Sequence, residues 1–274
     1  MRLTLGFTLL ITSVALLILN VYGLFKPWES SLIYSNSFTR PPGGSQYSYL
    51  QTMELLNNLS GEPADIASQA TDIIFKRMVH YWDDVGIDAY HLRIPIYKNY
   101  LFYLLSFIKP SIYLKYETCD PNLALARGVG LCSQQTLALV GVLQKKDISA
   151  RTITLNGHVV ATAQVSKNPE AWWIFDPDYG VVIPHSIEEL EKDQTLVASY
   201  YKNAGYADEI ATWVINKYTG GKNVVWSEGI YGYPDCSPFK SLIRTSCNYL
   251  IWIVPVLGII SAVILFRKLP TASR

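Results

Sequence analysis

The sequence lacks an excess of either charge, because 23 Lys and Arg residues stand against 22 Asp and Glu residues in 274 positions. A nucleic-acid-binding chain normally presents a basic surface, so this balance argues against nucleic acid as a partner. Only four cysteines are present and none forms a Cys-x-x-Cys pair, which argues against a structural zinc site. Acidic calcium-binding loops, internal repeats and low-complexity tracts are also missing. We therefore predict no metal and no cofactor.

The hydrophobic fraction, 50% of the chain, is slightly high for a soluble protein, and two uncharged runs at the ends of the chain explain the excess. Residues 3–19 carry no charge, and the stretch continued to Phe25 is long enough to cross a bilayer. Residues 249–266 form a second uncharged run with aromatic residues near one end. We interpret residues 1–25 as a transmembrane anchor. A cleaved signal peptide is the alternative, although its charged start would consist of Arg2 alone.

The charges that flank these two runs predict the orientation of the chain. Arg2 precedes the first run, and further basic residues follow the second. By the positive-inside rule, both termini are then cytoplasmic. We therefore predict a protein of the cytoplasmic (inner) membrane, with membrane lipid as a partner of its two helices and an extracytoplasmic, or periplasmic, main domain. The expected parts are the anchor 1–25, a linker 26–47, the domain 48–243, a transmembrane helix 249–266 and a cytoplasmic tail 267–274.

Four cysteines suit an oxidising compartment but do not prove one. Cys236 and Cys247 are close enough in sequence to form a bridge, and Cys119 could pair with either of them. Spacing does not choose among these pairings, nor does it exclude that all three remain thiols.

The middle of the chain predicts helices first. From Ser60, apolar residues recur at helical spacing, with Pro63 in the first turn. Residues 100–108 are apolar but too few to cross a bilayer. We interpret them as a core helix, with a position on the membrane surface as the alternative. Residues 131–147 are apolar nearly all round, which is typical of a helix buried at the centre of a domain.

Strand patterns follow this central helix. Residues 151–155 and 158–165 alternate between two faces, and residues 171–175 form a third strand closed by the turn Asp-Pro-Asp-Tyr-Gly. Ser186 then opens a capping-box pattern for a short helix, and another helix is expected near 206–218.

Three residues, in their order along the chain, fit the needs of thiol acyl transfer. Cys132 opens the central helix, where backbone N–H groups and the helix dipole stabilise a thiolate. His158 begins a strand after an Asn-Gly turn, so it could take the thiol proton. Asp176 ends the next strand and could hold the imidazole in one tautomer. Each residue alone has a structural explanation as a core thiol, a structural histidine or a turn residue. Their order favours a Cys-His-Asp catalytic triad.

The segment Arg127–Gly180 resembles the core of the transglutaminase-like superfamily, and the resemblance covers about 120–182. Shared features are a glycine before a helical cysteine, a leucine-rich run, an Ile-x-Ala-Arg strand entry at 148–151, a Gly-His pair and a Trp-x-x-x-Asp-Pro sequence. The resemblance implies a papain-like α+β fold, in which a buried helix bearing the cysteine packs on an antiparallel sheet, with additional N-terminal helices. It gives the triad roles to Cys132, His158 and Asp176.

The resemblance implies acyl transfer or hydrolysis at an amide or ester bond through a thioester, but it does not imply a substrate. Cross-linking members often carry a tryptophan after the cysteine, and this chain does not, which argues against calcium-dependent cross-linking. We hypothesise a membrane-tethered thiol enzyme acting on a protein, peptide or envelope polymer. The alternative is a non-catalytic module that binds a partner in a membrane-bound envelope assembly. A metal site of Cys132, His158 and Asp176 is least favoured, because only three scattered ligands are available.

Overall fold

The structure, a computed structural model, describes residues 2–28, 46–81, 90, 92–113, 117–218 and 223–267. Most of the expected linker and tail therefore lies outside the described residues. The chain divides into two compact units, here called the helical unit and the sheet unit. The helical unit contains Met1–Pro27, Leu92–Tyr116 and Phe239–Arg274, and the sheet unit contains Trp28–His91 and Glu117–Pro238.

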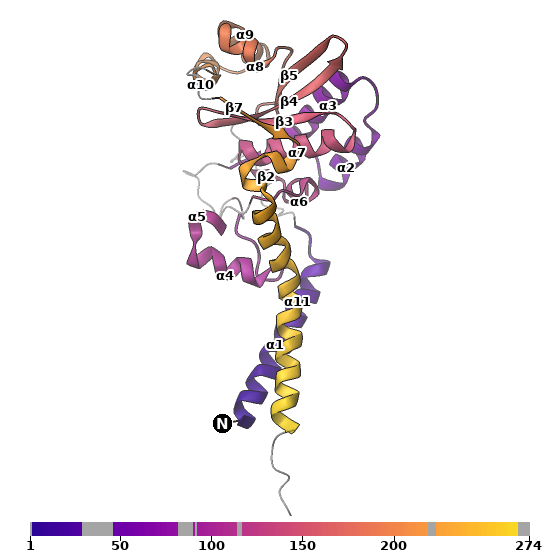
Figure 1. The fold of residues 1–274 in the computed structure, drawn as a ribbon, viewed down its shortest axis with the longest axis vertical. Helices are drawn as coiled ribbons and strands as arrows, with labels where there is room; N and C mark the ends of the chain where they lie inside the picture. The colour runs from indigo at the N-terminus through magenta and orange to yellow at the C-terminus, as the bar shows by residue number, and fades with distance from the viewer. Residues whose placement is uncertain are drawn as a thin grey trace, which may run out of the picture. The chain divides into compact units, whose positions relative to one another are not determined.

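A five-stranded antiparallel sheet with the order β6-β5-β4-β3-β7 forms the middle of the sheet unit (Figure 1). The three strands expected from the alternation of residues are β3, β4 and β5, and they lie next to one another in the sheet. A separate pair, β1 and β2, forms a short parallel ladder. The strands are β1 (Val79–His80), β2 (Val129–Gly130), β3 (Ala150–Leu155), β4 (His158–Lys167), β5 (Glu170–Asp176), β6 (Val181–Ile183) and β7 (Val224–Glu228).

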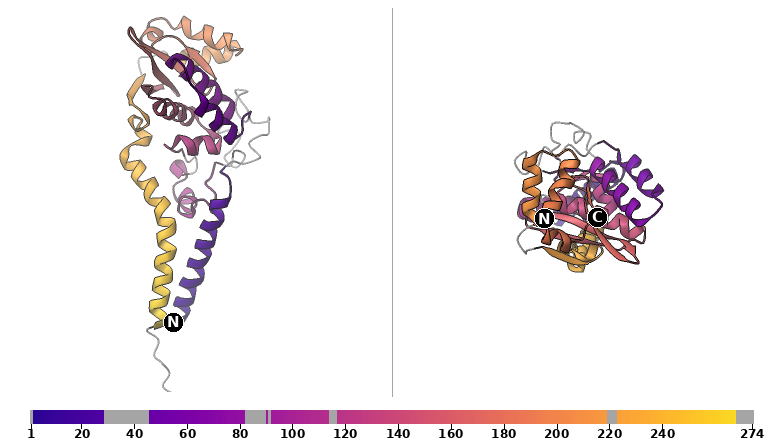
Figure 2. Two further views of the ribbon diagram at one scale, coloured as in Figure 1. Left: turned by 90° about the vertical axis from the view of Figure 1, so that its right-hand side faces the viewer. Right: turned by 90° about the horizontal axis from the view of Figure 1, so that it is seen from above.

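Helices cover both faces of this sheet, and each face has its own apolar cluster. Ala161 and Ala163 face the cluster formed with α2, α3, α6 and α7, whereas Val160 faces the one formed with α8, α9 and α10 (Figures 1 and 2). This follows from the alternation of side chains along a strand. The helices are α2 (Tyr49–Asn58), α3 (Pro63–Arg77), α6 (Pro121–Arg127), α7 (Cys132–Lys145), α8 (Ile187–Lys192), α9 (Thr195–Asn203) and α10 (Asp208–Tyr218), with short 3-10 helices η3 (Ile230–Gly232) and η4 (Pro234–Cys236).

The central helix α7 begins at Cys132, and every residue from Ser133 to Leu143 is buried. A helix that is apolar on all sides needs such burial, so the expectation of a central helix is confirmed. The capping box is also present, because the Ser186 side chain accepts from the Glu189 backbone N–H and the Glu189 side chain accepts from that of Ser186.

A disulfide joins Cys119, which precedes α6, to Cys236 in η4. Cys132 and Cys247 are free cysteines. Of the pairings that spacing left open, the structure therefore contains Cys119–Cys236, and it closes a loop with a sequence separation of 117.

The helical unit contains α1 (Arg2–Phe25) and α11 (Pro238–Arg267). Both helices are long and apolar enough to cross a membrane. They run antiparallel and approach closely, since a Cβ on Gly258 would lie 2.1 Å from Ser13 Oγ. Contacts along the pair join Gly6 to Phe266, Ser13 to Gly258 and Asn20 to Ile251.

The apolar stretch expected as a core helix is α4 (Tyr100–Ile108), followed by the short α5 (Pro110–Tyr113). Phe102 and Ser106 are buried, but Leu104, Phe107 and Ile108 are exposed. Only one side of α4 is therefore a core surface.

Candidate active site

Glycines set the path of the chain into Cys132. α6 ends at Gly128, whose φ of 69° is the left-handed conformation that glycine adopts at helix ends. The chain then forms β2, where Gly130 lies so close to Gln134 that a Cβ would be 2.5 Å from the Gln134 Cβ. Cys132 follows as the first helical residue, and its free thiol is half-buried. The thiol thus stands at the end of a helix whose first N–H groups have no intrahelical partner.

His158 and Asp176 lie together at the end of the sheet. An Asn156-Gly157 turn, with Gly157 at φ 84°, makes His158 the first residue of β4. Ala161 pairs with Phe175 in the neighbouring strand, so the next residue, Asp176, shares the face of His158. His158 Nε2 donates to Asp176 Oδ2 over 2.8 Å, and the two side chains are 1% and 0% exposed.

Asp176 accepts hydrogen bonds from more than the histidine. Its Oδ2 also accepts from the Tyr201 hydroxyl at 2.6 Å. Its Oδ1 accepts from the backbone N–H groups of Asp178 at 3.0 Å and Tyr179 at 3.3 Å. A buried carboxylate needs such partners, and together they hold Asp176 in one orientation against His158.

The environment of His158 favours its protonated form. Burial lowers the pKa of His158, but the charge of Asp176 and its hydrogen bond raise it, as does a hydrogen bond with Cys132. The net result is a pKa well above 6.5. With Nε2 engaged by Asp176, the ring nitrogen that remains for the thiol is Nδ1. The rings of Tyr179 and Trp213 stand edge-on to the imidazole at 5.7 and 5.9 Å between centroids.

A second buried carboxylate, that of Asp178, lies on the thiol side of the histidine. One of its oxygens, Cys132 Sγ and a ring nitrogen of His158 all lie within 4.8 Å of one another. A thiolate, an imidazole and a carboxylate are also metal ligands. Cys132, His158 and Asp178 are thus a group of described residues that could hold an ion, whereas the metal set weighed from the sequence contained Asp176. The absence of a metal stays a prediction.

Asp178 is held by two residues that the sequence did not single out. Its Oδ1 accepts from Gln135 Nε2 and is paired with His80 Nδ1, both at 2.6 Å. His80 reaches this place because β1 pairs with β2, with His80 opposite Gly130.

Of the residues Asp178, Gln135 and His80, the first two had a local signal in the sequence. Asp178 belongs to the same Asp-Pro-Asp turn as Asp176, and Gln135 lies one helical turn after Cys132. His80 had none.

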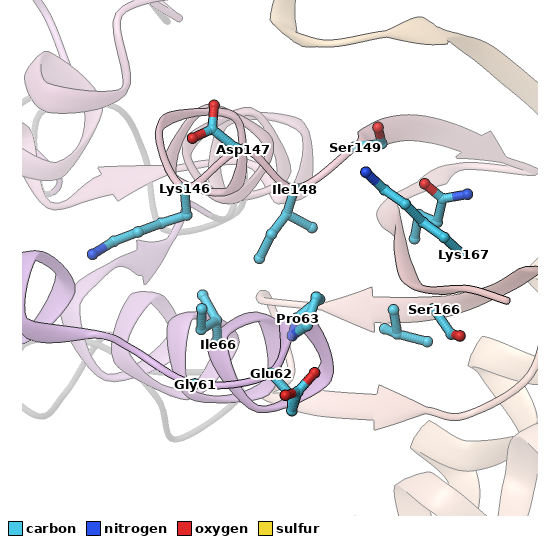
Figure 3. Close-up of a pocket in the computed structure, with 12 residues that line it drawn as sticks. Gly61, Glu62, Pro63, Ile66, Lys146, Asp147, Ile148, Ser149, Ser166 and Lys167 are labelled. Atoms are coloured by element: carbon cyan, nitrogen blue, oxygen red, sulfur yellow. The ribbon is translucent and has the colours of Figure 1, made fainter.

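A pocket of about 320 Å³ lies at the other end of α7 (Figure 3). Residues from the start of α3, the end of α7 and β4 line it. Figure 3 shows Ile66 and Ile148 pointing toward each other across this space. None of the predicted site residues lines the pocket, so it does not belong to the cysteine site.

No protein-family model, no curated protein and no solved structure matches the chain. The structure itself contains an α+β unit with a five-stranded antiparallel sheet, two candidate membrane helices and a cysteine–histidine–aspartate cluster. This arrangement is compatible with a thiol catalytic centre. The structure brings the three predicted residues together, since His158 contacts both Cys132 and Asp176. Their catalytic roles stay a prediction.

Proposed function

We propose that the protein is a membrane-tethered, transglutaminase-like thiol enzyme that transfers or hydrolyses an acyl group at an amide or ester bond. One observation carries the proposal: a buried imidazole lies between the Asp176 carboxylate and the Cys132 thiol at the first turn of a buried helix. A nucleophile, a base and a group that orients the base are the parts that covalent acyl transfer needs.

Each residue has one task in the proposed reaction. Because the protonated form of His158 is favoured, the pair reacts as an imidazolium and a thiolate. His158 Nδ1 holds the proton taken from the thiol, and Cys132 Sγ attacks the carbonyl carbon of the substrate as a thiolate. The N–H groups at the start of α7 stabilise the oxyanion that forms. The C–N or C–O bond then breaks, His158 gives its proton to the departing amine or alcohol, and the acyl group remains on sulfur as a thioester.

The second half of the reaction reverses these proton transfers. Water or an amine attacks the thioester and gives its proton to His158. The carbon–sulfur bond breaks, and Cys132 leaves as a thiolate beside the imidazolium, which restores the starting pair. Asp176 keeps Nε2 protonated throughout and stabilises the charged ring.

The proposed location is the cytoplasmic membrane, with both termini in the cytoplasm and the sheet unit outside. The antiparallel pairing of α1 and α11 supports it, because Gly6 contacts Phe266 and the two basic ends of the pair then lie together. The Cys119–Cys236 disulfide also supports it, since disulfides persist in oxidising compartments. The substrates would then be protein, peptide or envelope-polymer groups near the membrane.

The test uses iodoacetamide on the full chain in isolated membranes, without reductant. Only Cys132 and Cys247 are free cysteines, so Cys247 in α11 serves as an internal reference. We expect His158→Ala to slow alkylation of Cys132 relative to Cys247, because the thiol loses its base. An unchanged ratio would overturn the enzyme proposal and favour the non-catalytic module.

A second measurement identifies the chemistry. An acyl group trapped on Cys132, in His158→Ala protein purified from cells, would appear as a mass adduct on the peptide that contains Cys132. Removal of the adduct by hydroxylamine would show that it is a thioester, and its mass would identify the acyl donor.

A further inference from the structure

We propose that α4 is an interfacial helix that lies in the surface of the bilayer, with its exposed apolar face among the lipid chains of the outer leaflet. This inference rests on the membrane placement proposed above, but not on the chemistry of Cys132. The face consists of Leu104, Phe107 and Ile108, which are 53%, 58% and 77% exposed. Spacings of three and four residues place these side chains on one side of the helix, and so large an apolar face is unusual in contact with water.

The start of α4 is attached to one end of the α1–α11 pair. At that end α1 finishes its apolar run before Lys26, and α11 begins its apolar run after Asn248. Lys98, Asn99 and Tyr100 make the connection by hydrogen bonds. Lys98 Nζ donates to the Gly23 carbonyl at 2.8 Å and to the Lys26 carbonyl, Asn99 Nδ2 donates to Asn248 Oδ1 at 3.0 Å, and the Tyr100 hydroxyl donates to the Ile251 carbonyl at 3.2 Å.

Aromatic residues gather at the same end of the pair. Tyr22 and Tyr97 stack edge to face at 5.6 Å between ring centroids, and Lys26 Nζ lies 4.9 Å from the Tyr22 ring centroid. Tyr249 on α11 is 66% exposed. Tyrosine and tryptophan concentrate where the hydrocarbon core meets water. This end of the pair is therefore the level of a membrane–water boundary, and α4 begins there.

The length and direction of α4 fit a surface position. Its nine residues extend over about 14 Å, less than half of a hydrocarbon core. Figure 1 shows α4 running across the α1–α11 pair instead of along it. The Arg93 guanidinium lies 4.3 Å from the Phe107 ring centroid and donates to Ser106 Oγ at 2.6 Å. An apolar ring covered by a charged head suits the boundary between lipid chains and head groups.

The test compares three labelled positions in the full chain. The background carries Cys132→Ser and Cys247→Ser, and a single cysteine at Phe107, Ile11 or Leu50 receives a polarity-sensitive fluorophore. Ile11 is 66% exposed on α1 and serves as the lipid reference, whereas Leu50 is 78% exposed on α2 of the sheet unit and serves as the water reference. The protein is reconstituted into vesicles of phosphatidylcholine and phosphatidylglycerol.

We expect the Phe107 label to show blue-shifted emission, to lose most of the iodide quenching seen at Leu50, and to be quenched by nitroxide lipids labelled near the head group. The Ile11 label should respond most to nitroxides deep in the chains. Iodide quenching at Phe107 equal to that at Leu50, with Ile11 in lipid, would overturn the interfacial helix and leave the membrane placement standing. Quenching of all three labels by iodide would overturn both. The same measurement at Ile108 shows whether either result is peculiar to the Phe107 substitution.

Discussion

The sheet unit and the helical unit both bury polar side chains, but they do so with different chemistry. In the sheet unit the buried side chains include ionisable groups, and Asp176, at 0% exposure, has four hydrogen-bond donors around it. In the helical unit Asn20, at 3% exposure, makes a single neutral hydrogen bond to the Ile251 carbonyl. A neutral amide is enough to align two helices. A buried ion and its partners are costly to assemble, so their concentration around one thiol points to function.

The largest expected difference between the two units is in activity. If the proposed function holds, Cys132→Ser or His158→Ala should lower the turnover of the cellular substrate by about 10³-fold or more, because both residues would then act as one catalytic unit. The double variant should be hardly worse than Cys132→Ser. Complementation of a deletion strain measures the effect, with immunoblots of the membrane fraction to confirm equal amounts. Asn20→Leu is the matched control and should complement fully. Full complementation by Cys132→Ser would leave the site without a catalytic role.

The second largest difference between the two units is expected in the free energy of unfolding when a cysteine is replaced. Cys119→Ser opens a loop of sequence separation 117, which in the chain-entropy description costs about 4–5 kcal/mol of folding free energy. Cys247→Ser in the helical unit breaks no bridge and should change the unfolding of the sheet unit by less than about 1 kcal/mol. Denaturant unfolding of the full chain in detergent, followed by tryptophan fluorescence, measures both. A Cys119→Ser variant as stable as the parent would contradict this account.

The pH dependence of stability should distinguish the charged site from the neutral helix pair. The raised pKa of His158 means that the folded chain holds this proton more tightly than the unfolded chain does. The stabilisation is fully present below the unfolded pKa of about 6.5 and is lost as the pH rises through the folded pKa.

Asp176→Asn tests that account. In the parent, burial lowers the pKa of His158 and the Asp176 carboxylate raises it above the ordinary value. Without the carboxylate, burial should dominate, and the loss of stability with rising pH should shrink. Unfolding free energies measured between about pH 5 and about pH 9 provide the comparison. Parallel curves for the two proteins would mean that His158 does not govern the slope.

The smallest effect is expected in the helix pair itself. Asn20→Leu removes one hydrogen bond to the Ile251 carbonyl, and such bonds between membrane helices contribute about 0.6 kcal/mol. Energy transfer between labels on α1 and α11 in vesicles should therefore change little. Gly258→Leu should reduce it more, because a Cβ there would lie 2.1 Å from Ser13 Oγ. A large loss of transfer in Asn20→Leu alone would show that the neutral amide matters more than its single bond suggests.

Local periodicity predicted those parts of the fold whose burial repeats along the chain. α3, α7 and β3 to β5 follow from apolar spacing, because each element buries one face or all of its surface. β7 was missed, since Val224 and Val225 are exposed and the strand exists through its pairing with β3. Partner-dependent elements of this kind leave little trace in their own residues.

The residues of the candidate site likewise differ in whether local sequence could predict them. Cys132, His158 and Asp176 follow one another along consecutive elements, so their order could be recognised in the sequence. His80 instead depends on the two-residue ladder between β1 and β2. The residues near His80 show no pattern that predicts this pairing, because a contact between distant segments depends on the fold as a whole.

The bond between Cys119 and Cys236 makes a covalent ring of the chain between them. Cys132, His158 and Asp176 all lie within this ring, whereas His80 lies outside it. A single backbone cut inside the ring opens it but releases no fragment, so the three groups stay linked until the sulfur–sulfur bond is reduced. In a compartment that contains proteases and no strong reductant, a chain cut once inside the ring would therefore keep the candidate site together as a two-chain molecule.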